Sequence, residues 1–148
     1  MTLRTFIAIE IVPEIADALH DFQKQVKLAH DKAKLTKPGN IHLTMVFLGT
    51  MFQEQVPVVS EAMEITAKGF SPFDCMVAGT GFFGSPRSPR IVWAGIKRNA
   101  DIITSIYNRL ADELRQRGFT IEDRPYSPHI TLCPDPVRLR CGEASCGA

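Results

Sequence analysis

The sequence predicts an α+β fold, and three observations support this. Short apolar stretches rich in β-branched residues alternate with longer stretches in which apolar residues recur at helical spacing. Turns rich in proline and glycine separate these stretches. The 148 residues, of which 45% are hydrophobic and 22% charged, are enough for one globular domain with a buried core. We therefore expect helices packed on a sheet.

The expected elements follow one another as strand, helix, strand, helix, two strands, helix and two strands. Pro13 and Pro57 suit the first turns of two of the helices, where a missing N–H costs no hydrogen bond. Gly118 is a natural end for the third helix. Trp93 is expected in the core of its strand, and residues 84–90 are expected to form a loop. The strands are predicted at residues 3–9, 41–48, 73–81, 91–96, 119–121 and 128–132, and the helices at residues 13–29, 55–68 and 101–117.

The charge balance and the cysteines limit the class of protein. With 17 basic and 16 acidic residues, the net charge of +1 provides no general attraction for nucleic acid, so any RNA binding must be local. No apolar run approaches the ~20 residues of a membrane span. The four cysteines form no CxxC pair, which is typical of reduced thiols and gives no zinc-ligand spacing. We expect a cytoplasmic, monomeric protein with no membrane segment.

One four-residue motif occurs twice. Residues 42–45 read His-Leu-Thr-Met and residues 129–132 read His-Ile-Thr-Leu, and each copy follows a turn that contains proline. Because side chains alternate between the faces of a strand, His and Thr of each copy should share one face while the apolar residues enter the core. The other two histidines, His20 and His30, lack this context and are expected to be exposed to solvent.

The residue types of the repeated motif suit phosphodiester cleavage. That reaction needs a base to deprotonate water and an acid to protonate the leaving oxygen, and two imidazoles with pKa values near ~6.5 can do both near neutral pH. His42 and His129 are therefore the candidate catalytic residues. Thr44 and Thr131 are the candidate substrate-binding residues, because their hydroxyls can donate to the phosphate oxygens. This mechanism requires no metal and no cofactor.

Several further stretches accompany the motifs, and together they resemble the two-histidine (2H) phosphoesterases. The closest resemblance is to the bacterial RNA 2′,3′-cyclic phosphodiesterases once named 2′-5′ RNA ligases. The stretches that carry it are residues 4–9, 37–49, 81–84, 89–95 and 128–132. The resemblance implies a bilobal fold, with two pseudo-symmetric lobes of sheet and helix around a central cleft.

The resemblance also implies a reaction. It is the hydrolysis of a 2′,3′-cyclic phosphate at an RNA or nucleotide end to a 2′-phosphate, with a reversible 2′-5′ RNA ligase activity in some members. It further implies that His42 donates a proton and that His129 accepts one.

The sequence departs from this family after the second motif. Members continue with a basic residue and with more strand and helix, whereas here Pro134 stands near the place of the expected arginine. We expect one domain over residues 1–148 whose end after about residue 132 is atypical or truncated. Two alternatives stay open: a non-catalytic nucleotide- or RNA-binding module on the same fold, and a family enzyme that acts on another cyclic phosphate or on a 2′-5′ linkage.

Overall fold

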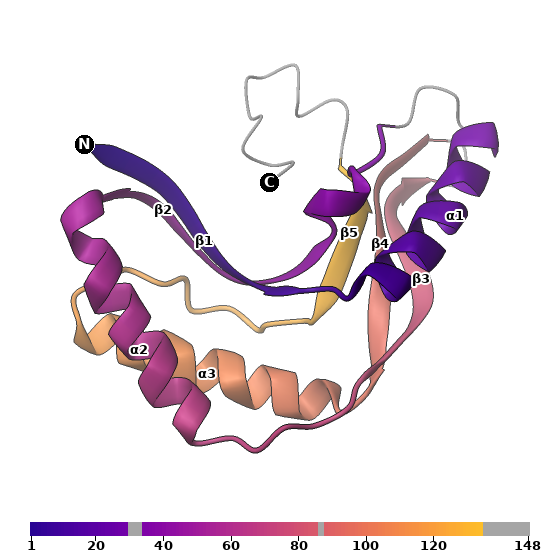
Figure 1. Cartoon of the computed structure of the whole chain (residues 1–148). Coiled ribbons are helices and arrows are strands. Elements are labelled where there is room, and N and C mark those ends of the chain that lie inside the picture. The colour runs from indigo at the N-terminus through magenta and orange to yellow at the C-terminus, as the bar shows by residue number, and fades with distance from the viewer. Residues whose placement is uncertain (30–33, 86–87, 135–148) are drawn as a thin grey trace. The chain divides into compact units, whose positions relative to one another are not determined.

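The computed structural model describes residues 1–29, 34–85 and 88–134, and it has the predicted α+β architecture (Figure 1). Three helices and five strands follow one another in nearly the predicted order. Two single 3₁₀ turns, at Pro38–Asn40 and Gln53–Gln55, flank the second strand. The elements are β1 (Thr2–Glu10), α1 (Pro13–Ala29), β2 (His42–Phe52), α2 (Val56–Lys68), β3 (Met76–Ser85), β4 (Ser88–Arg98), α3 (Ala100–Gln116) and β5 (His129–Cys133).

The strands form a sheet in the hydrogen-bonded order β1-β2-β5-β4-β3. The last strand of the chain, β5, therefore lies between β2 and β4, and it pairs antiparallel with both. In this way the topology brings the second copy of the motif beside the first, although 86 residues separate His42 from His129 in the chain.

The chain divides into two compact units. Unit 1 comprises residues 1–8, 44–76 and 96–128, and unit 2 comprises residues 9–43, 77–95 and 129–148. Unit 1 contains α2 and α3 with most of β1 and β2. Unit 2 contains α1, β5, most of β3 and β4, and the first two residues of β2. The arrangement of two lobes around a central cleft stays a prediction.

Helices α2 and α3 pack against each other in unit 1 (Figure 1). The apolar residues that recur at helical spacing along α3 include Ile103, Leu110 and Leu114, which are between 0% and 4% exposed, and Ala62 of α2 is 0% exposed. Gly118 ends the helix with φ of +92°, a left-handed backbone conformation that glycine adopts without strain. The amphipathic pattern of α3 was therefore a reliable guide to its buried face.

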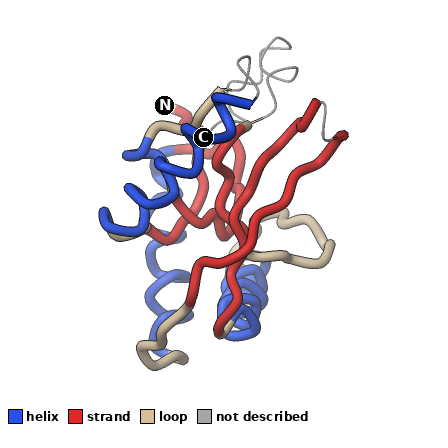
Figure 2. The backbone as a smooth tube through the Cα atoms, turned by 90° about the vertical axis from the view of Figure 1, so that its right-hand side faces the viewer, coloured by secondary structure: helices blue, strands red, loops and turns tan. Residues whose placement is uncertain are grey.

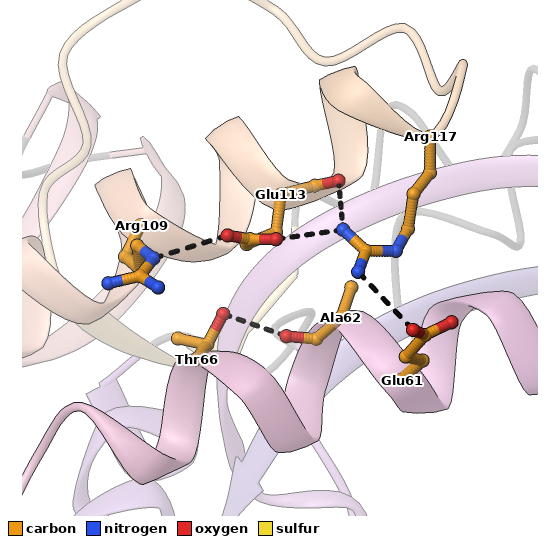
Figure 3. Close-up of polar contacts among 6 residues, drawn as sticks. All are labelled: Glu61, Ala62, Thr66, Arg109, Glu113 and Arg117. Atoms are coloured by element: carbon orange, nitrogen blue, oxygen red, sulfur yellow. Dashed lines mark hydrogen bonds and ion pairs between the residues drawn. The ribbon is translucent and has the colours of Figure 1, made fainter.

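Polar contacts also connect residues of this helix pair (Figure 3). The Glu113 carboxylate accepts hydrogen bonds from Arg117 at 2.8 Å and from Arg109 at 3.3 Å. The Arg117 hydrogen bond, with that of Arg109, holds the pKa of the Glu113 carboxyl below its usual value. Arg117 also reaches Glu61 of α2 at 3.8 Å, so the guanidinium links the two helices.

The strand predicted at residues 119–121 was wrong, because that segment forms no strand. Its polar groups are bonded to α3 instead. The Phe119 N–H donates to the Leu114 carbonyl at 3.1 Å, and the Arg115 guanidinium donates to the carbonyls of Ile121 and Glu122 at 3.2 and 3.1 Å. An arginine in the last turn of the helix thus supplies the partners that a neighbouring strand would otherwise provide.

The loop predicted at residues 84–90 was too long. Strand β3 continues to Ser85 and β4 begins at Ser88, so only residues 86–87 lie between them, outside the described residues. Figure 2 shows this hairpin as two long neighbouring strands. Pro89 is compatible with it because it stands at the second position of β4, where proline is tolerated more readily than in a strand interior.

Candidate active site

The two motif strands are hydrogen-bonded neighbours. Strands β2 and β5 pair antiparallel with Leu43 opposite Ile130. Both residues enter the core, at 2% and 0% exposed. Because opposite residues share a face and successive residues alternate, His42, His129 and Thr131 lie together on the other face of this strand pair in unit 2.

The register also sets the spacing of the two histidines. His42 is opposite Thr131, so His129, two residues earlier on β5, is its diagonal neighbour. Diagonal neighbours on an antiparallel pair are about 7–8 Å apart. Two imidazoles that extend from such positions can both reach one phosphate-sized group. His129 is exposed and His42 is half-buried.

Thr44 and Thr131 occupy different units. Thr131 stands beside the histidines in unit 2 and is half-buried. Thr44 is the first residue of the second segment of unit 1, and strand alternation puts it on the same side of β2 as His42. Three of the four predicted site residues are thus gathered in one unit, and the fourth follows two residues after His42.

Tyr126 holds the backbone of the first motif at Thr44. Its hydroxyl donates a hydrogen bond to the Thr44 carbonyl at 2.8 Å, within unit 1. Its ring stacks on that of Tyr107, with centroids 4.3 Å apart and planes 6° apart. Burial, and to a smaller extent the neighbouring Tyr107, raises the pKa of the Tyr126 phenol. Sequence reasoning missed this residue because a tyrosine in a loop carries no signal of a contact 82 positions away.

Strand β5 contains a bulge immediately after Thr131. Thr131 is opposite Trp93 and Cys133 is opposite Val92, so Leu132 is an extra residue with no partner of its own on β4. Its carbonyl instead accepts hydrogen bonds from the Thr36 N–H and from Gln23, both at 2.8 Å.

Gln23 of α1 anchors this bulge. Its side chain is 0% exposed, and its Nε2 donates to the carbonyls of Leu132 and Thr36, each at 2.8 Å. The Gln23 Oε1 accepts from His20 Nδ1 at 2.9 Å. His20 is therefore half-buried and hydrogen-bonded, and the expectation that it would be exposed was wrong. His30 lies outside the described residues.

Trp93 lies beside the second motif, and the expectation that it belongs to the core was wrong. It is opposite Thr131 on β4, so it shares the face that carries His129, and it is half-buried. The core face of β4 belongs instead to its neighbour Ala94, which is 1% exposed and opposite Ile130. Because the residues of this strand are apolar without alternation, their pattern does not indicate which face of the strand is buried.

Comparison with known proteins identifies the family. The model of the LigT-like phosphoesterases matches residues 9–93, more than half of the chain. The chain belongs to this family. The LigT-like chain is 32% identical over 130 residues to the RNA 2′,3′-cyclic phosphodiesterase of Thermotoga maritima, covering 88% of this chain and 68% of that protein.

Solved structures of the family share the fold. A crystal structure of a Thermus thermophilus protein matches with a TM-score of 0.80 and 27% identity, covering 90% of this chain and 74% of that one. The structure of E. coli LigT in complex with 3′-AMP matches with a TM-score of 0.69 and 26% identity, covering 91% and 74%. The LigT-like chain thus spans roughly 70% of the length of these relatives.

None of the helices described is long and apolar enough to cross a membrane. Across residues 1–29, 34–85 and 88–134, His, Cys, Asp and Glu side chains form no group of three or more that could hold a metal ion. Independence of metal stays a prediction.

We expect Gln23→Met to destabilise this LigT-like protein by about 1–3 kcal/mol, because the buried Thr36 carbonyl loses its donor and Leu132 keeps only one. Urea unfolding followed by circular dichroism measures this loss. Gln25→Met is the matched control on an exposed position of α1 and should change stability by less than about 0.5 kcal/mol. Equal effects of the two substitutions would contradict the anchoring role.

Tyr126→Phe should lower the free energy of unfolding by about 0.5–1.5 kcal/mol at neutral pH. The Thr44 carbonyl loses its hydrogen bond, while the stacking of the ring on Tyr107 remains. The raised pKa sets the pH dependence. Below about pH 10, the usual tyrosine pKa, the phenol is protonated in both the folded and the unfolded state and its contribution is complete. Above that pH the unfolded state alone ionises, so the gap between wild type and Tyr126→Phe should narrow. A gap that stays constant in urea unfolding at alkaline pH would contradict this.

Proposed function

We propose that this chain is an RNA 2′,3′-cyclic phosphodiesterase that opens the cyclic phosphate to a 2′-phosphate, with His42 and His129 as the acid/base pair. The observation that carries the proposal is the register of β2 and β5, in which the two histidines are diagonal neighbours on one face. Membership of the LigT-like family supports it, as does the relative from Thermotoga maritima that bears this name.

In the proposed reaction, water attacks the phosphorus while His129 accepts the proton from the water. The bond between phosphorus and the 3′ oxygen breaks, and His42 donates a proton to that leaving oxygen. The product carries a 2′-phosphate and a free 3′ hydroxyl, so atoms and charge balance. After one turnover His42 is neutral and His129 is protonated, and exchange with solvent restores both.

The threonines are proposed to bind the phosphate. Charge on the non-bridging oxygens increases as water adds, and hydroxyl donors that are already in place stabilise it. Thr131 stands opposite His42, and Thr44 follows His42 on the same side of β2. The proposed partner is an RNA or nucleotide end that bears the cyclic phosphate. The monomeric state and the cytoplasmic location stay predictions.

The first test is activity on a 2′,3′-cyclic nucleotide across pH. Because one imidazole must be protonated and the other neutral, the rate should be bell-shaped in pH. His42→Ala and His129→Ala should each remove nearly all turnover, and the double variant should lose little more, since acid and base act as a unit.

Two further variants and a second substrate sharpen this test. Thr131→Val should lower kcat by about 10²–10³-fold, the usual effect of removing one hydrogen-bond donor to the oxyanion. A substrate with a better leaving group should partly rescue His42→Ala but not His129→Ala. Gln25→Met should retain full activity. A flat pH profile, or substantial turnover by the double histidine variant, would refute acid/base catalysis. No hydrolysis by the wild type would favour the alternative of a non-catalytic binding module.

The second test concerns metal. The proposed chemistry needs only the two imidazoles and the hydroxyl donors, so hydrolysis should proceed unchanged after dialysis against EDTA. Assays of the dialysed protein with and without added zinc or magnesium measure this directly. Activity that disappears on chelation and returns with either ion would count against the mechanism.

A further inference from the structure

Trp93 and His129 face each other diagonally across β4 and β5. Trp93 is opposite Thr131, and Gly95 is opposite His129. Because the residue directly across from His129 has no side chain, the indole can lie beside the imidazole. The two ring centroids are 6.3 Å apart and the ring planes are inclined by 59°. This is the tilted, edge-to-face range in which aromatic pairs attract, with centroids about 4.5–7 Å apart.

Gly81 of β3 determines where the indole lies. A Cβ at this position would stand 2.1 Å from Cζ2 of Trp93 and 2.5 Å from its Cη2, closer than atoms approach in proteins. The indole therefore packs directly on the backbone of β3. Its Nε1 is buried and has no hydrogen-bond partner among the described residues. Packing against Gly81, rather than a hydrogen bond, thus sets the orientation of the ring.

We propose that Trp93 is a positioning residue that orients His129, and that Gly81 acts through Trp93. The inference rests on the proposed function, in which His129 accepts the proton from water. An exposed histidine can occupy several rotamers, and only some direct a ring nitrogen toward the phosphate. The fixed indole restricts these rotamers on one side.

The contact can be tested without any assay of activity, because Trp93 is the single tryptophan of the chain. Its fluorescence should change with pH when the imidazole beside it gains a proton, because a positive charge then appears next to the indole. His129→Ala should abolish this transition. His42, a second titratable group on the same face, serves as the control, and His42→Ala should keep it. A transition that survives in His129→Ala, or its absence in the wild type, would overturn the proposed contact.

The functional role can be tested with hydrolysis kinetics. Trp93→Leu should lower kcat by about two- to tenfold, with little change in KM. This factor corresponds to the interaction free energy of one aromatic pair, expressed as a change in rate. Trp93→Phe keeps an aromatic ring beside His129, so its kcat should be close to that of the wild type. Gly81→Ala should lower kcat similarly because its methyl group displaces the indole. Gly69→Ala is the matched control, since its added methyl would meet only ordinary contacts at 3.5 Å and beyond.

The double variant decides whether Gly81 acts through Trp93. When Trp93 is already replaced by Leu, adding Gly81→Ala should lower kcat only slightly further, because the ring that the added methyl would displace is absent. Losses that add in full, or a Trp93→Phe variant no better than Trp93→Leu, would overturn the positioning role. Urea unfolding of each variant serves as the control that the substitution leaves the protein folded. A wild type without hydrolytic activity would overturn the proposed function and the role in it, while the fluorescence titration would still decide whether Trp93 holds His129.

Discussion

The pairing of Leu43 with Ile130 is the constraint on which the site depends. These two residues are buried on one face of β2 and β5, so the burial of apolar surface fixes the register of the strands. A slip of either strand by one residue would turn its histidine into the core and its apolar residue outward. The free energy that holds the core together therefore also holds His42 and His129 on one face.

Contacts within each unit hold the backbone beside the motif residues. In unit 2, the buried side-chain amide of Gln23 donates a hydrogen bond to the carbonyl of Leu132, the bulge residue that has no partner on β4. In unit 1, the Tyr126 hydroxyl binds the Thr44 carbonyl just after the first histidine. Each contact satisfies a backbone group that would be costly to leave buried and unpaired. Polar residues distant in sequence thus fix the backbone on which the site residues stand.

The sequence was sufficient for the elements and for the repeated motif, because both depend on local patterns. Helical spacing located α3 and its buried stripe, and strand alternation predicted that Leu43 and Ile130 would be buried. It was not sufficient for Gln23, Tyr126 or Trp93, whose partners lie elsewhere in the chain and leave no periodic signal. The strand expected at residues 119–121 failed for the same reason: the Arg115 guanidinium, and not another strand, binds the carbonyls at its end.

The bulge at Leu132 has a consequence for resistance to oxidation. By simple alternation Cys133 would follow His129 and Thr131 onto the face of the proposed site. The extra residue turns it inward instead, where it is 3% exposed and opposite Val92. Burial raises the pKa of the Cys133 thiol to about 11, so near neutral pH the sulfur is almost entirely the unreactive thiol. Peroxide attacks the thiolate and needs access to it. A cysteine two residues from Thr131 is thus kept from forming a sulfenic acid beside the proposed site.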